Sequence, residues 1–351
     1  MDYNEVRHRL ESREETLSPY AAKSRLSRGR KVHEEPSPLR TEFQRDRDRI
    51  IHTKAFRRLK HKTQVFIAPL GDHYVTRLTH TLEVSQIGRT IARALNVNED
   101  LVEAMALGHD LGHPPFGHIG EEVLSELYPT GFRHSLQSLR VVDHLEKEGR
   151  GLNLTWEVRQ GIVTHSKSSL AILGKDWKNP PTLEAQICKL ADALAYINHD
   201  TGDAIRSGLV SEDGLPEEVV SVLGTTNSER INTLVTDVVR NSWAATGQVS
   251  LKEGQTPTIT MGREVQEAAN VLRDFLFERV YRVSGASPEA EKARGVIKFL
   301  YQHFLDHTEE ISIEYRIRGN GKDRWTLDYI AGMTDRYALR MAEEMSLTPA
   351  I

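Results

Sequence analysis

The sequence predicts an all-α protein, and three observations support this fold class. From Arg45 onward, apolar residues recur at three- and four-residue steps, as they do on the buried face of an amphipathic helix. Alternating β-branched runs, which are typical of strands, are few. The composition is that of an ordinary globular chain, with 351 residues of which 38% are hydrophobic and 27% charged, and it excludes collagen-like and wholly disordered chains.

A polar, basic arm over residues 1–40 precedes the helical body, and we expect it to be extended with one short helix. Residues 1–62 carry 17 Lys and Arg against 10 Asp and Glu, whereas the remaining residues carry 29 against 40. Such clustered cations can bind the phosphates of nucleic acid or nucleotides. They can equally pack on an acidic body, and composition alone does not separate the two interpretations.

Periodicity predicts the helices in order along the chain. A long helix over about residues 75–95 carries an apolar stripe that includes Val84, and His80, one turn earlier, falls on the same inward face. Further helices are expected over residues 43–60, 119–127, 134–147, 155–165, 183–205, 216–223, 228–243, 263–282, 288–306 and 326–345, with a turn-rich loop at 67–72. Periodicity is lost over 246–258, which divides a core, residues 41–245, from a C-terminal helical region, residues 246–351, packed on it.

The segment over residues 100–111 is apolar nearly all round, which predicts a helix in the middle of the domain. It ends at Gly112, and the prolines that follow prevent its continuation. The resulting Gly- and Pro-rich loop carries His113 and His118, and the next helix places Glu121 within one turn of His118. A carboxylate beside an imidazole suits general acid–base catalysis, although Glu121 could instead favour the helix N-terminus and His118 could cap it.

Four residues on segments that should be buried form a candidate metal site: His80, His109, Asp110 and Asp192. Buried carboxylates are costly unless they are paired or bind a cation. Two imidazoles and two carboxylates suit Mn²⁺ or Mg²⁺, with Fe²⁺, Co²⁺ and Zn²⁺ as alternatives. A single inward histidine is more often an ordinary core residue, so the prediction depends on the four together.

The helix that carries Asp192 also places Tyr196 and Asp200 on the same face, at steps of four residues. A metal ligand, an aromatic ring and a second carboxylate in line could hold a nucleotide beside the metal. The alternative is an amphipathic helix with a solvated edge.

Several motifs together resemble the HD-domain phosphohydrolases, and within them the deoxynucleoside triphosphate triphosphohydrolases, which include bacterial dGTPase-like proteins. The motifs are RDRDRIIH at residues 45–52, AFRRL at 55–59, KTQV at 62–65, TRLTHTLEV at 76–84, HDLGHPPFGH at 109–118, DALAYINHD at 192–200 and DYIAGMTD at 328–335. The resemblance implies an HD-domain helical bundle with additional C-terminal helices, and a reaction that converts a dNTP and water into deoxynucleoside and tripolyphosphate.

The resemblance also implies roles for individual residues. His118 and Glu121 match the family's catalytic pair, and His113 and His134 join them as candidate catalytic residues. Tyr196 matches the residue that stacks on the deoxyribose, Asp200 and Gln64 match those that meet the 3'-hydroxyl, and Arg77 matches a phosphate-binding arginine.

One segment departs from the family pattern. Family members commonly have Phe-Glu-His-Asn-x-Gln after the HD motif, whereas this chain has Phe132, Arg133, His134, Ser135, Leu136 and Gln137. Arg133 replaces a carboxylate and reverses the local charge.

Two other functions share parts of this sequence pattern. One is an HD-type phosphodiesterase or 5'-nucleotidase that acts on nucleoside monophosphates or cyclic nucleotides with the same metal ligands. The other is a nucleic-acid-binding regulatory protein with a vestigial site, which the basic arm and Arg133 suggest. We further expect a homo-oligomer, with a nucleotide effector and single-stranded nucleic acid as candidate partners.

The sequence also predicts a cytoplasmic protein. No stretch has the roughly 18 uninterrupted apolar residues of a membrane helix, and the first residues lack the apolar core of a secretion signal. The single cysteine, Cys188, excludes an intrachain disulfide and fits a reducing compartment.

Overall fold

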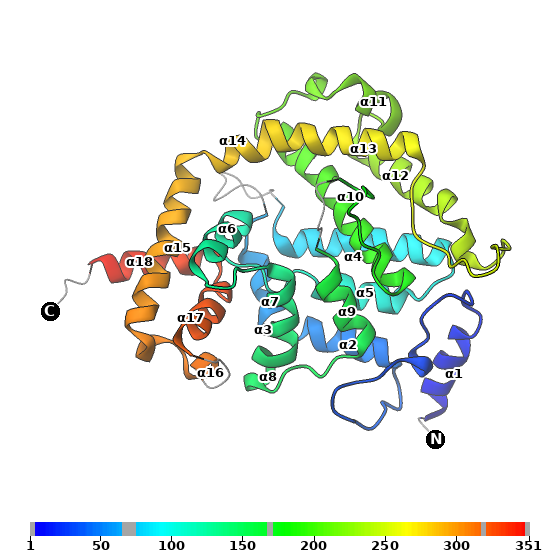
Figure 1. Ribbon diagram of the computed structural model, residues 1–351, viewed down its shortest axis with the longest axis horizontal. Helices are drawn as coiled ribbons and strands as arrows, with labels where there is room; N and C mark the ends of the chain where they lie inside the picture. The colour runs from blue at the N-terminus through cyan, green and yellow to red at the C-terminus, as the bar shows by residue number, and fades with distance from the viewer. Residues whose placement is uncertain (1–3, 65–74, 167–170, 317–320, 348–351) are drawn as a thin grey trace. The chain divides into compact units, whose positions relative to one another are not determined.

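The computed structural model describes residues 4–64, 75–166, 171–316 and 321–347. In these ranges the elements of secondary structure are helices joined by loops, which confirms the all-α prediction (Figure 1). In these ranges extended chain pairs only at two isolated β-bridges. The loop predicted at 67–72 lies outside the described residues.

The chain forms two compact units. The first consists of Met1–Ile51, His80–His109 and Asn153–Val280, and the second of His52–Thr79, Asp110–Leu152 and Tyr281–Ile351. The predicted division at residues 40 and 245 stays a prediction.

The first unit is built around one long central helix. Its helices are α1 (Asn4–Glu14), α2 (Glu42–Ile51), most of α4 (Arg77–Ala94), α5 (Glu99–Gly108), α9 (Trp156–Thr164), α10 (Leu183–Arg206), α11 (Glu217–Leu223), α12 (Asn227–Asn241) and α13 (Arg263–Leu276). Helix α10 begins where the Thr182 hydroxyl accepts a hydrogen bond from Ala185 N. It packs on α5, α9, α12 and α13, and almost all its side chains are buried (Figure 1).

The second unit surrounds helix α15. Its helices are α3 (Lys54–Arg58), α6 (Gly117–Leu127), α7 (His134–Arg140), α8 (Glu146–Gly149), α14 (Arg282–Gly285), α15 (Pro288–Asp306), α16 (Ile313–Arg316), α17 (Lys322–Ala331) and α18 (Asp335–Leu347). Helix α15 packs on α6, α17 and α18 (Figure 1). Their shared core includes Leu124, Ile297, Phe304 and Ile330. This core fixes the start of α6, where the loop with two predicted catalytic histidines ends.

Two helices that were predicted as continuous are interrupted. The helix predicted over 43–60 divides into α2 and α3, because the Thr53 hydroxyl accepts a hydrogen bond from Phe56 N and starts a new helix. The helix predicted over 326–345 divides into α17 and α18 around Gly332. In addition, α7 ends in a π-helical turn, Val141–Leu145, inside the helix predicted over 134–147.

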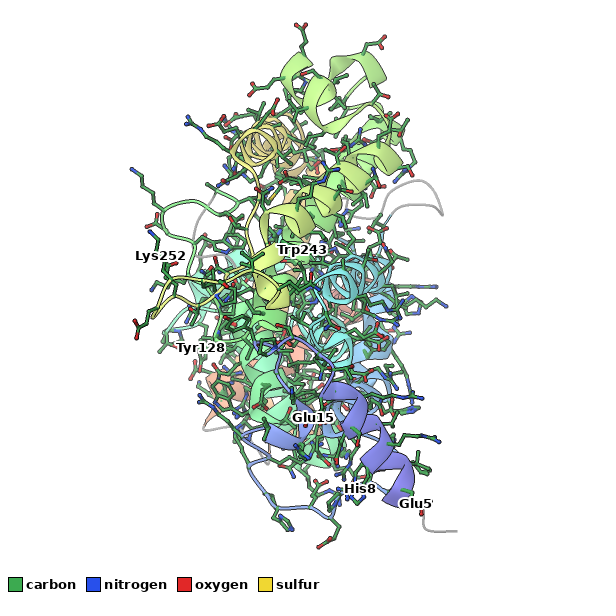
Figure 2. All side chains as sticks on the ribbon, turned by 90° about the vertical axis from the view of Figure 1, so that its right-hand side faces the viewer. Glu5, His8, Glu15, Tyr128, Trp243 and Lys252 are labelled. Atoms are coloured by element: carbon green, nitrogen blue, oxygen red, sulfur yellow. The ribbon has the colours of Figure 1, made fainter. Side chains whose placement is uncertain are left out.

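Many cations of the basic arm are neutralised within the first unit. The guanidinium of Arg30 binds the carboxylates of Glu42 and the buried Asp46. At the end of α1, Glu15 binds Lys23 at 2.8 Å and Arg25 at 2.7 Å; Figure 2 labels Glu15. These cations are therefore engaged with carboxylates of the same N-terminal segment, Glu15 within the arm and Glu42 and Asp46 directly after it. Among the described residues, no helix is both long and apolar enough to span a bilayer.

A fully buried carboxyl group, that of Glu184 in α10, joins the arm to the helical body. Its Oε1 accepts hydrogen bonds from the backbone N–H of Ala22 at 2.9 Å and of Asn98 at 3.1 Å. Burial raises the pKa of Glu184 to about 7, although these backbone donors oppose the shift. Below about pH 7, the protonated carboxyl group is therefore the form that the folded state favours.

This shift gives an expected pH dependence of stability. Because the pKa in the folded state lies above the unfolded value, the stabilisation is complete below about pH 4.5 and is lost as the pH rises through 7. In Glu184→Gln this loss should be absent. The free energies of unfolding of the wild type and the variant, measured in urea, should diverge by roughly 2–3 kcal/mol between pH 5 and pH 8. The exposed Glu218→Gln serves as control, and parallel pH profiles of wild type and Glu184→Gln would contradict the assignment.

Candidate functional site

Three side chains of the first unit converge on one point. His80 comes from α4, His109 directly follows α5, and Asp192 comes from α10. The Nε2 atom of His80 lies 3.2 Å from Oδ1 of Asp192, and the Nε2 atom of His109 lies 3.9 Å from the same oxygen. Both imidazoles are fully buried. Two imidazoles and a carboxylate thus face one another away from bulk water.

Hydrogen bonds orient the other ring nitrogens of both histidines. Nδ1 of His109 donates to the backbone oxygen of Ala106 at 2.6 Å, so that Nε2 carries the lone pair. Nδ1 of His80 lies 2.9 Å from Nε2 of His199. Metal-binding histidines typically have such a second hydrogen bond, which fixes the tautomer and the ring orientation. The donor set and its support therefore fit a divalent cation held by the Nε2 atoms.

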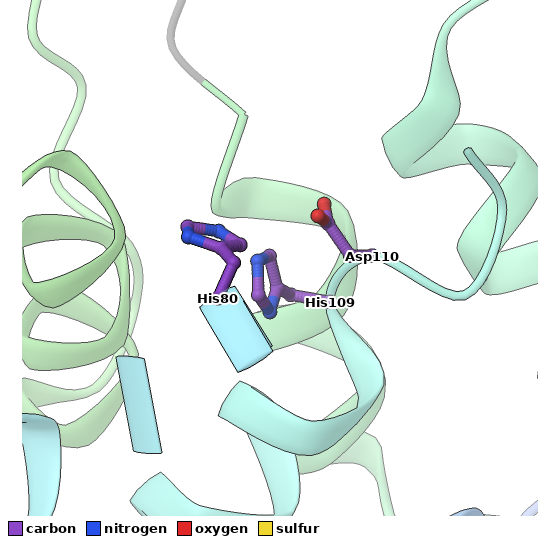
Figure 3. Close-up of side chains that lie close together, drawn as sticks. All are labelled: His80, His109 and Asp110. Carbon is purple, nitrogen blue, oxygen red and sulfur yellow. The ribbon is translucent and has the colours of Figure 1, made fainter. Parts of the chain in front are cut away.

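Asp110 adds a second carboxylate next to His109. The boundary between the two units falls at the peptide bond between His109 and Asp110. The chain itself therefore keeps these two residues next to each other. His80, His109 and Asp110 each offer one ligand atom, and these atoms lie within 4.8 Å of one another (Figure 3). Within the second unit, Arg77 Nη1 donates to Asp110 Oδ2 at 2.8 Å, and His113 Nε2 lies 3.3 Å from Asp110 Oδ1.

The loop after Asp110 turns tightly, and three of its residues are constrained by close packing or by a left-handed backbone. At Gly112, a Cβ atom would lie 2.1 Å from the backbone nitrogen of Ser138, so only glycine fits. Phe116 and Gly117 both have a left-handed backbone, with φ of 62° and 56°, and α6 begins there. The predicted loop thus carries His113 and leads directly into the helix of His118 and Glu121.

In the second unit, Glu121 binds His134 more closely than it binds His118. One carboxylate oxygen lies 2.8 Å from His134 Nδ1, and the other accepts a hydrogen bond from His134 N at 2.8 Å. By contrast, His118 Nδ1 lies 4.0 Å from Glu121, and 59% of the His118 side chain is exposed. The ring of His113 stacks on that of His134, with ring centroids 3.9 Å apart. The structure therefore assembles His113, His134 and Glu121 into one cluster with His118 at its edge.

The environments of these groups separate their pKa values. Although burial opposes both effects, the contact between His134 and Glu121 lowers the pKa of the carboxyl and raises the pKa of the imidazole. Burial, reinforced by the charge of Arg77, lowers the pKa of His113 well below its usual range. The cluster thus stacks an imidazole whose charged form is favoured, His134, on one whose neutral form is favoured, His113, and such a pair can serve as acid and base.

The predicted substrate residues also occupy defined places. Arg77, the first residue of α4, and Gln64 are both buried in the second unit, and Gln64 Oε1 has no hydrogen-bond partner among the described residues. In the first unit, Tyr196 is half-buried, and its ring lies edge-on to His199 with centroids 6.1 Å apart. Asp200 is fully buried, and its Oδ1 lies 2.8 Å from His199 Nδ1.

His199 is a site residue that our sequence predictions did not include. It lies between Asp200 and His80, and its charge is favoured because the carboxylate of Asp200 raises the pKa of His199, although burial opposes this shift. Its signal was available, since His199 is seven residues after Asp192 and therefore on the same face of α10.

Two further residues, Lys62 and Asp335, hold this loop in place; both lie in motifs quoted above, but our sequence analysis assigned them no role. Lys62 Nζ donates to the backbone oxygens of His113 and Ala331. Asp335 accepts hydrogen bonds from Thr63 N at 2.9 Å, Thr63 Oγ1 at 2.6 Å and Phe116 N at 2.9 Å. Burial, with the help of nearby arginines, lowers the pKa of Lys62 to about 7. Lys62 thus ties the loop to Ala331, and Asp335 ties both the loop and Thr63 to the C-terminal part of the chain.

Removal of the Asp335 anchor is expected to lower turnover while leaving metal content unchanged. Asp335→Ala should lower kcat by about 10²-fold, because misplacement of catalytic groups by about 1 Å has an effect of this size. Asp335→Asn, which keeps one acceptor oxygen, should retain more activity than Asp335→Ala, and the exposed Asp306→Ala should behave as wild type. An unchanged kcat in Asp335→Ala would show that the anchor does not position the loop.

Comparison with known proteins agrees with this geometry. Residues 77–197 match the HD domain, and residues 259–344 match the phosphohydrolase-associated domain. The chain is 53% identical to the deoxyguanosinetriphosphate triphosphohydrolase-like protein of Caldanaerobacter subterraneus subsp. tengcongensis over 99% of this chain and 96% of that relative. Proteins of the same name from Desulfatibacillum aliphaticivorans and Clostridium tetani are 47% and 45% identical, over 95% and 97% of this chain and 96% and 95% of their own lengths.

The HD-domain match includes His80, His109 and Asp192, and the phosphohydrolase-associated match includes Asp335. At 53% and 47% identity over nearly the whole chain, these relatives share the fold and the family of this chain. The chain therefore belongs to the HD-domain phosphohydrolases, in the family of deoxyguanosinetriphosphate triphosphohydrolase-like proteins.

Proposed function

We propose that this chain is a metal-dependent dNTP triphosphohydrolase that converts a dNTP and water into deoxynucleoside and tripolyphosphate. The observation that carries the proposal is the convergence of His80, His109 and Asp192 on one point, with the ring nitrogens oriented for a metal. The acid–base cluster of His113, His134 and Glu121 supports it. The name of the relatives supports a nucleotide as substrate.

We assign His80, His109, Asp110 and Asp192 as the residues that would hold the metal. Their nitrogen and oxygen donors suit Mn²⁺ or Mg²⁺, with Fe²⁺, Co²⁺ and Zn²⁺ as alternatives. A divalent ion supplies Lewis acidity toward a phosphoryl oxygen and activates water.

The protein's own residues then perform the remaining work. Arg77, whose guanidinium binds Asp110, would bind phosphoryl oxygens of the triphosphate through its planar fork. A bond forms between the water oxygen and the α-phosphorus, and the bond to the 5'-oxygen breaks. The leaving 5'-oxygen needs a proton, and the attacking water must lose one. We assign these transfers to His118 on α6 and His134 on α7, which flank Glu121, and to His113, whose lowered pKa makes it the candidate base.

Product analysis tests the proposal. The protein is incubated with each of the four dNTPs and either Mn²⁺ or Mg²⁺, and the products are separated by anion exchange. Tripolyphosphate and deoxynucleoside in equal amounts are expected. Release of orthophosphate or pyrophosphate would contradict the proposal, and hydrolysis of monophosphates or cyclic nucleotides in place of dNTPs would favour a nucleotidase or phosphodiesterase.

Sugar selection is expected to depend on the ring of Tyr196. We propose that this ring lies against C2' of the deoxyribose, with Asp200 and Gln64 near the 3'-hydroxyl. Ribonucleotides should then be poor substrates, and loss of a hydrogen bond to the 3'-hydroxyl should weaken dideoxynucleotides roughly 5- to 150-fold. Tyr196→Ala should relax the rejection of GTP relative to dGTP, whereas Tyr196→Phe, which keeps the ring, should retain it. Equal kcat/KM for GTP and dGTP in the wild type would contradict the assignment.

A further inference from the structure

The second unit contains an open cavity that shares no residue with the proposed metal, catalytic or substrate-binding sets. It has a volume of about 570 Å³ and lies among the end of α6, the chain that follows it, α7 and the start of α17. The lining residues that define its chemistry are Tyr128, Phe132, Arg133, Leu136, Arg140 and Arg324. This volume lies in the range of about 300–1,000 Å³ that small-molecule sites occupy.

The cavity wall is strongly basic. Three of the lining residues are arginines, and none of the lining residues is acidic. Two of these arginines are held in place from behind: Asp328, which is fully buried and lies outside the lining, binds Arg140 Nη2 at 2.6 Å and Arg324 Nη2 at 2.7 Å. Because one carboxylate cannot neutralise three guanidinium groups, the cavity keeps a net positive charge.

Two donors on this wall lack partners among the described residues. The Nε atom of Arg324 is buried and makes no hydrogen bond. The guanidinium of Arg133, which is exposed, makes neither a hydrogen bond nor an ion pair in the described part of the chain. Because the Arg324 Nε atom is buried, the donor available to a ligand is the exposed guanidinium of Arg133, whose planar fork matches the spacing of phosphate oxygens.

An aromatic side chain stands beside this charge. Tyr128, labelled in Figure 2, is half-buried, and the Arg324 guanidinium lies 5.7 Å from the centre of its ring. Cations on separate helices and a cavity of this size suit an anion with several phosphoryl groups better than a single orthophosphate.

We propose that this cavity is a binding site for a condensed phosphate chain, either free tripolyphosphate or the triphosphate tail of a nucleotide. The site is additional to the proposed hydrolytic centre. Arg133 is the residue that tests it, because its exposed guanidinium carries the third positive charge of the lining.

Direct binding to the full chain tests the proposal separately from hydrolysis. Tripolyphosphate, orthophosphate and dGTP are titrated calorimetrically at fixed ionic strength without added divalent metal. Tripolyphosphate should bind at least tenfold more tightly than orthophosphate. For each ligand, the binding that Arg133→Glu removes is assigned to the cavity: an equal loss for tripolyphosphate and dGTP would assign the site to the phosphate chain, and a larger loss for dGTP would assign it to a nucleotide.

Variants then locate the binding in the cavity. Arg133→Glu should weaken tripolyphosphate binding by about 10- to 100-fold, the range for hydrogen bonds to charged groups, and Arg133→Lys should weaken it less. Arg336→Glu, which makes the same charge change at an exposed position outside the cavity, should bind as wild type. Undiminished affinity in Arg133→Glu, or an equal loss in Arg336→Glu, would overturn the proposal. Failure of dNTP hydrolysis would leave these binding results unaffected.

Discussion

Asp110→Ala is expected to lose both bound metal and dNTP hydrolysis. The change removes one of the four proposed ligands and also frees the guanidinium of Arg77, which Asp110 binds at 2.8 Å. An uncompensated buried cation would then lie one turn before His80 on α4, and it would repel a divalent ion. Metal content by elemental analysis should fall close to zero, and turnover should fall below detection.

Asp213→Ala is the matched control, because it removes an exposed carboxylate far from this set in sequence. It should keep full metal content and full activity. Full metal occupancy in Asp110→Ala would show that the set of His80, His109, Asp110 and Asp192 is not the metal site.

His118→Ala is expected to keep its metal and to lose turnover. We place His118 in proton transfer and outside the ligand set, and groups in that role typically contribute about 10²- to 10⁴-fold. The expected result is a fall of kcat in this range with unchanged metal content. His33→Ala, which removes an imidazole that is 87% exposed, is the control.

The structure offers His134 as an alternative residue for proton transfer. Its Nδ1 lies 2.8 Å from Glu121, whereas Nδ1 of His118 lies 4.0 Å away. An unchanged kcat in His118→Ala would remove that residue from the mechanism. A loss of 10²- to 10⁴-fold in His134→Ala, measured alongside, would then assign proton transfer to His134.

The fold class and the residues on periodic helices could be predicted because their signals are local. The inward face that includes His80, and the apolar segment that ends at His109, follow from three- and four-residue steps. The spacing from Asp192 also places Tyr196 on one face of α10. These local signals place the residues on the inward faces of their helices.

Interactions between distant segments could not be predicted in this way. No local pattern shows that Glu121 binds His134 on another helix, or that Asp335 binds Thr63, 272 residues earlier. The interruption at Thr53 was also missed, since an N-cap inside a helical pattern is a weak signal beside the periodicity around it. The basic arm is a further case, because composition counts its cations but cannot show that Arg30 is paired.

The anchoring of the catalytic loop has a consequence for the newly made protein. Phe116 N donates to Asp335, which follows it by 219 residues, so this contact cannot form until that later part has been synthesised. At about 5–20 residues per second, the ribosome needs roughly 10–40 s to cover this interval. During that time the loop already exists in the nascent chain but lacks its anchor. We expect a growing chain to gain hydrolytic activity only after Asp335 has left the ribosome and can accept the hydrogen bond from Phe116 N.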